Sequence, residues 1–105
     1  MNLQIRTRGI KMTRPLEEVV ERRIRFALHR FGERVRHVHV QLTDLNGPRG
    51  GVDTRCKVEV SLDSIGSVIV HETSDTPFTA VALASDTVSR AVRRKIKRLQ
   101  GRRRA

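Results

Sequence analysis

The stretch RHVHVQLT, residues 36–43, alternates polar and apolar side chains without interruption. Because successive side chains of a β-strand point to opposite faces of its sheet, this pattern predicts a strand with Val38, Val40 and Leu42 facing a core. The polar side chains then point the other way. We therefore expect one face of the sheet to be buried and the other to be open.

A strand and a helix are predicted upstream of this stretch. Apolar and polar residues alternate over residues 2–7, which indicates a first strand. The helix is expected to begin after Thr13 as its N-cap, with Pro15 in its first turn, and to end at Gly32 as its C-cap. Its apolar stripe recurs with the helical period and consists of Leu16, Val20, Ile24, Ala27, Leu28 and Phe31.

Downstream of this stretch, a loop over residues 46–51 leads to two more strands, over residues 55–62 and 67–73, which a short turn connects. A second helix is expected over residues 77–99, with Thr76 as its N-cap. The inward-facing residues of the strand that begins at position 55 are Cys56, Val58, Val60 and Leu62. The apolar stripe of the second helix consists of Val81, Val88, Val92 and Leu99.

The element order β-α-β-β-β-α predicts an α+β fold of two layers. A strand–helix–strand unit makes a right-handed crossover between parallel strands, whereas the short later connections require antiparallel pairing. We expect a four-stranded mixed sheet with both helices packed on one face. This single α/β domain is predicted over residues 1–100, with Gly101 ending the helix before a basic, flexible tail over residues 101–105. The open sheet face carries His37, His39, Gln41, Arg55, Lys57 and Glu59.

Positive charge is the feature of the composition that bears most on function. The formal net charge is +11 in 105 residues, and nine of the last sixteen residues are Lys or Arg, with no acidic residue among them. Such dense charge implies a polyanionic partner. Since no apolar run approaches a membrane span and no signal-peptide pattern is present, the predicted partner is nucleic acid and not a membrane. Cys56, the only cysteine, is interpreted as a small buried hydrophobe and fits a reducing cytoplasmic location.

The basic residues are expected on the helix faces that point away from the core. An α-helix turns about 100° per residue, which places Arg90 and Arg94 opposite the stripe of the second helix and Lys95 at the core edge, where it must snorkel. If the two helices pack side by side, their outer faces form one basic surface. The predicted RNA-contacting residues on it are Arg22, Arg23, Arg25, Arg90, Arg93, Arg94 and Lys97.

A helix-borne basic surface of this kind is typical of phosphate contacts to structured RNA. The chain has no Trp or Tyr and only three Phe, so an aromatic stacking platform for single strands is not expected. Most of the cations are arginines, whose planar guanidinium suits bidentate contacts to phosphate. Phe26 falls off the apolar stripe of the first helix, and its role is either lateral packing or contact with a partner.

No catalytic or cofactor-binding motif is visible. The glycines at positions 47, 50 and 51 do not form a phosphate-binding loop, and no nucleophile–base spacing is present. We therefore predict no enzyme activity, no cofactor and no small-molecule substrate. His37 and His39, together with His71, are the only candidates for a metal site, and no carboxylate or cysteine clearly joins them, so no metal is predicted.

The sequence of the second helix resembles that of the corresponding helix in a known family. Residues 76–83 read TPFTAVAL and residues 87–94 read TVSRAVRR. The corresponding helix of the family reads Asp, Pro or Met, Tyr, two small residues, Ile and Asp, then a hydrophobic stretch and a basic run. The chain thus resembles the family of ribosome hibernation-promoting factor and ribosome-associated inhibitor A, the sigma-factor modulation proteins. The positions that match the basic residues of the family are Arg22, Arg23, Arg90, Arg93 and Arg94.

The resemblance implies the same fold and a role at the ribosome. Family members bind the small ribosomal subunit near the decoding centre, exclude messenger and transfer RNA, and act when growth slows. By this resemblance the chain, a monomer when free, is expected to bind the ribosomal RNA of the small subunit. It is expected to inhibit translation or promote ribosome hibernation under stress and in stationary phase. The chain departs from the family at Thr76, Phe78 and Ala82, where the family has Asp, Tyr and Asp.

Two alternatives remain open on the residues alone. The first is a general binder of double-stranded RNA or DNA, which duplex would titrate away from the ribosome. The second is a protein-interaction module that uses the open sheet face. That reading predicts binding that is little affected by salt and sensitive to changes at His39 or Lys57.

Overall fold

The predicted order of strands and helices is confirmed. The computed structural model describes residues 1–47 and 53–104, so most of the predicted loop over residues 46–51 lies outside the described residues. The elements are β1 (Asn2–Arg8), α1 (Arg14–Leu28), a 3-10 helix η1 (His29–Arg34), β2 (Val35–Asp44), β3 (Thr54–Leu62), β4 (Gly66–Ser74) and α2 (Pro77–Arg104).

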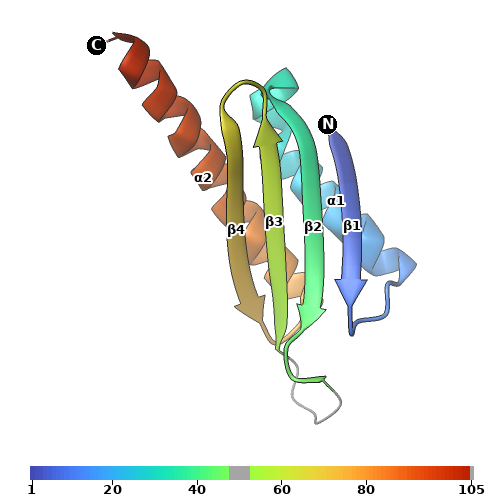
Figure 1. The fold of residues 1–105 in the computed structure, drawn as a ribbon. Coiled ribbons are helices and arrows are strands. Elements are labelled where there is room, and N and C mark those ends of the chain that lie inside the picture. The colour runs from blue at the N-terminus through green and yellow to red at the C-terminus, as the bar shows by residue number, and fades with distance from the viewer. Residues whose placement is uncertain (48–52, 105) are drawn as a thin grey trace.

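The four strands form one mixed sheet in the order β1-β2-β3-β4. β1 pairs parallel with β2, and β3 pairs antiparallel with both of its neighbours. The helices α1 and α2 contact each other and lie side by side on one face of this sheet (Figure 1). The predicted two-layer α+β fold is therefore confirmed.

The core lies between the sheet and the two helices. Val40 of β2, Ile24 of α1 and Val88 of α2 belong to one cluster of buried side chains. All the residues of β2 and β3 that were predicted to point inward are buried, and Cys56 is among them. Removing these apolar side chains from water is the main favourable term in folding, and it holds both helices in place on the sheet.

Threonine side chains cap the N-termini of both helices, as predicted. The Thr13 Oγ1 accepts a hydrogen bond of 3.3 Å from the backbone N–H of Leu16 at the start of α1. The Thr76 Oγ1 accepts one of 3.1 Å from the backbone N–H of Thr79 at the start of α2. Each bond satisfies a backbone donor that has no partner within its helix.

Both predicted helix ends are wrong. The α1 helix ends at Leu28 instead of Gly32, and the chain then tightens into η1, inside which Gly32 takes a left-handed φ of 58°. The glycine does serve a turn, but one turn later than a direct C-cap. At the other end of the chain, Gly101 does not adopt a left-handed φ, and α2 continues to Arg104. A glycine permits a helix to end without requiring it. Residues 101–104 therefore continue α2, and Ala105 lies outside the described residues.

We expect Ile24→Ala to lower the free energy of unfolding by about 2–5 kcal/mol, because Ile24 has no exposed surface and its truncation leaves a cavity in the core. Urea denaturation followed by circular dichroism measures the change. Phe26→Ala is the matched control two positions away. Its side chain is 85% exposed, so a change within about 0.5 kcal/mol is expected. Equal losses for the two variants would contradict the packing of α1.

Cys56 gives a second prediction, because burial raises the pKa of its thiol to about 12 from an ordinary value of 9.0. The native state then holds the thiol proton to higher pH than the unfolded chain does. The associated stability is complete below pH 9.0 and is lost as the pH rises toward about 12. We expect a colorimetric thiol reagent to leave the native protein unlabelled at about pH 8 and to label it quickly in denaturant. Fast labelling of the native protein would show that Cys56 is accessible.

Candidate nucleic-acid interface

The C-terminal half of α2 presents a row of exposed cations. Val88 and Val92 are fully buried against the core, and the helical turn directs Arg90 and Lys97 to the opposite side, where both are exposed. Arg93 and Arg94 flank them and are also exposed. In the part of the chain that the structure describes, no acidic side chain forms an ion pair with any of these four residues. This part of α2 also extends beyond the strands of the sheet (Figure 1).

Lys95 anchors this part of α2 to the sheet. Its half-buried side chain reaches past the core edge, and its Nζ donates a hydrogen bond of 3.1 Å to the backbone carbonyl of Ser67 in β4. The predicted snorkelling of Lys95 is confirmed. The contact ties α2 to β4 at the start of that strand.

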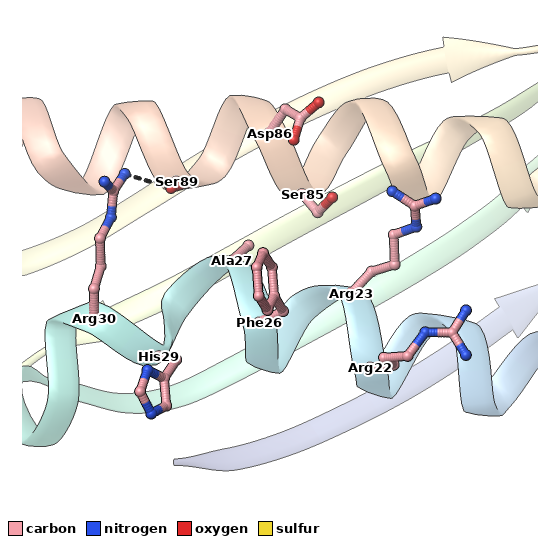
Figure 2. A pocket seen from close by; sticks show the side chains of 9 residues that line it. All are labelled: Arg22, Arg23, Phe26, Ala27, His29, Arg30, Ser85, Asp86 and Ser89. Atoms are coloured by element: carbon pink, nitrogen blue, oxygen red, sulfur yellow. Dashed lines mark hydrogen bonds between the residues drawn. The ribbon is translucent and has the colours of Figure 1, made fainter.

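A groove of about 730 Å³ separates α1 from the first half of α2 (Figure 2). Arg22, Arg23 and Phe26 line it from α1, and Arg30 lines it from η1. From α2 it is lined by Ser85, Asp86 and Ser89. Two of the predicted RNA-contacting residues, Arg22 and Arg23, therefore lie along the boundary between the helices.

Arg30 connects the groove to the cations of α2. Its Nη2 donates a hydrogen bond of 2.7 Å to the Oγ of Ser89 (Figure 2), the residue that precedes Arg90. Its guanidinium carbon also lies 4.9 Å from the centre of the Phe31 ring, which is within the range of a cation–π contact. The hydrogen bond therefore places Arg30 beside the start of the cation row on α2. The basic two-helix surface is made of Arg22, Arg23, Arg30, Arg90, Arg93, Arg94 and Lys97.

Arg25 is the predicted site residue that the structure does not bring to this surface. Its Nη2 lies 3.3 Å from the Oε1 of Glu21, one turn earlier on α1. Glu21 lines a shallow hollow with Leu3 and Ile5 of β1, so this ion pair lies on the β1 side of α1, away from α2. Glu21 therefore offsets much of the charge that Arg25 contributes.

The match to a known family covers nearly the whole domain. Residues 3–100 match the family model of the sigma 54 modulation protein / S30EA ribosomal protein. The chain belongs to this family. No curated protein sequence matches the chain significantly.

Two solved structures have a similar fold. The N-terminal domain of Protein Y from Thermus thermophilus superposes with a TM-score of 0.73 at 21% identity, covering 90% of this chain and 98% of that one. A ribosomal subunit interface protein from Coxiella burnetii superposes with a TM-score of 0.73 at 17% identity, covering 91% of this chain and 99% of that one. At these identities the likeness concerns the fold.

The histidines of this S30EA domain are not assembled into a metal site. His37 and His39 lie on β2, whereas His71 lies on β4 with β3 between them, so about 10 Å of sheet separates the two strands. In the described ranges 1–47 and 53–104, no group of three or more metal-ligating side chains comes together. No helix in those ranges is long and apolar enough to cross a membrane.

Arg30 and Asp86 were not among the residues predicted for the site, and Phe26 was predicted either to pack laterally or to contact a partner. Arg23, Phe26 and Arg30 recur at spacings of three and four, a signal that could have grouped them on one side of the predicted first helix. Their meeting with Asp86 required the packing of α2 against α1, which the sequence pattern does not specify.

Proposed function

We propose that this protein binds the small ribosomal subunit through the basic two-helix surface, by contacts to the phosphates of ribosomal RNA. In that position it inhibits translation or promotes ribosome hibernation in stressed or slowly growing cells. Membership of the S30EA family supports an association with the ribosome, and one structural relative is described as a ribosomal subunit interface protein. Binding as a monomer in the cytoplasm, without a cofactor, is part of the same proposal.

The observation that carries this proposal is the continuity of the charge. The hydrogen bond between Arg30 and Ser89 joins the arginines of the groove to those of α2. Buried valines on the opposite side of α2 hold its cations in place. A row of guanidinium groups on a rigid helix suits the phosphates of structured RNA, because the helix fixes the backbone positions from which the side chains reach.

The open sheet face offers the competing site. A hollow of about 330 Å³ on it is lined by Arg6, His39 and Lys57 among others, and Glu59 adds a carboxylate. This mixture of signs suits an acidic or mixed protein surface better than a run of phosphates. A charge-matched pair of variants distinguishes the two faces.

We predict that Arg90→Glu combined with Arg94→Glu abolishes co-sedimentation with purified small subunits and leaves the fold intact, because both side chains are exposed. The matched control is Arg6→Glu combined with Lys57→Glu, which makes the same change of net charge on the open sheet face. That control is expected to retain binding. Retained binding by the α2 double variant, with loss in the control, would move the interface to the sheet.

Competition with duplex separates a ribosome-specific protein from a general nucleic-acid binder. We expect an excess of double-stranded RNA of unrelated sequence to leave the complex with small subunits largely intact at physiological salt. Displacement of the protein from small subunits by this duplex would favour the general binder, since non-specific binding depends on phosphate density and not on the identity of the RNA.

The salt dependence of the affinity for small subunits should distinguish Arg23 from Arg25. Arg23→Gln removes a cation from the groove, so the slope of log affinity against log salt should flatten by about one unit. Arg25→Gln should flatten it less, because Glu21 already offsets much of that charge. Affinities measured between about 50 and 200 mM salt give both slopes. A larger change for Arg25→Gln would show that the ion pair opens on binding.

A further inference from the structure

Phe26 is the feature of the groove that phosphate contacts do not explain. Its side chain is 85% exposed, more than any other large hydrophobic side chain of the described residues. It does not pack laterally, so it contributes little to the stability of the domain. The ring instead stands in the groove between α1 and α2 (Figure 2).

Arginines flank Phe26 along the groove. Arg23 precedes Phe26 by three residues on α1, and Arg30 follows it on η1. All three side chains line the groove that faces α2 (Figure 2). Arg23 on α1 and Arg30 on η1 therefore stand on either side of the ring along the groove (Figure 2). An apolar ring between two guanidinium groups suits a nucleotide whose base leaves the stack while its phosphates contact the arginines.

The polar residues of the groove orient such a nucleotide. Arg30 is held by Ser89 and by the ring of Phe31, so part of its guanidinium is already ordered for a phosphate. Asp86 lies on the α2 side of the groove. A carboxylate there would repel phosphate and can accept hydrogen bonds from base amino groups. The backbone therefore belongs along the arginines of α1, and the base edge points toward α2.

We propose that Phe26 stacks on one unpaired nucleobase of the bound RNA, and that the groove is the site where this protein selects an irregular RNA over a regular duplex. The proposal rests on the proposed function and names the RNA element that the same surface recognises. Loss of the stacking contact between a base and an aromatic side chain weakens binding about 5- to 100-fold.

Substitutions at position 26 test this proposal on purified small subunits. Phe26→Ala and Phe26→Leu should each weaken binding by about 5- to 100-fold, whereas Phe26→Trp, which keeps an aromatic face, should retain it. The salt slope should stay unchanged in all three, because no phosphate contact is removed. Phe78→Ala, a truncation at a 44% exposed ring that does not line the groove, is the control and should leave the affinity within about twofold.

A photo-cross-linking side chain, p-benzoylphenylalanine at position 26, identifies the contacted molecule. A cross-link to ribosomal RNA supports the stacking site. A cross-link to a ribosomal protein or to a second copy of this chain would overturn it, as would wild-type affinity in Phe26→Ala or full retention in Phe26→Leu. In those cases the loss of binding in the Arg90 and Arg94 double variant still supports the proposed function. A wild-type protein that does not bind small subunits would overturn both.

Discussion

The burial of the apolar stripe of α2 is the constraint on which the rest of the surface depends. Val81, Val88 and Val92 have no exposed surface, and they fix the rotation of the helix about its own axis. Because each residue turns the helix by about 100°, that rotation also fixes the direction of every cation on the same helix. A change in core packing would therefore redirect the cations even though no cation had been altered.

The same constraint makes a dense cationic surface tolerable in a small domain. Like charges on neighbouring turns repel one another, and a net charge of +11 works against a compact state. The apolar contacts of α2 and the hydrogen bond from Lys95 to β4 offset this repulsion. A polyanion that binds the surface removes the repulsion and stabilises the folded state by mass action, so function and stability are linked through the same charges.

Sequence patterns were sufficient for the features that depend on local periodicity. Alternation specified β2 and β3, the helical stripes specified α1 and α2, and hydroxyl caps marked where both helices begin. The predictions that failed concern features that depend on tertiary context. Gly32 and Gly101 are compatible with several backbone conformations, and packing decides which is adopted. Likewise, the i,i+4 spacing of Glu21 and Arg25 permits an ion pair, but that this pair lies on the β1 side, away from α2, follows from how the helices pack.

In the proposed complex, the site divides into residues that hold RNA and a residue that distinguishes one RNA from another. Contacts to phosphate set position and affinity, but they are the same for any sequence, so a surface made only of arginines cannot separate the ribosome from other structured RNA. Selecting one RNA over another requires a group that contacts bases or recognises the shape of the RNA. The chain has three Phe and no Trp or Tyr, and Phe26 is the one of the three that stands exposed among the cations of the groove. With so few aromatic residues, the proposed base stacking is confined to Phe26, which lines the groove where α1 and α2 meet.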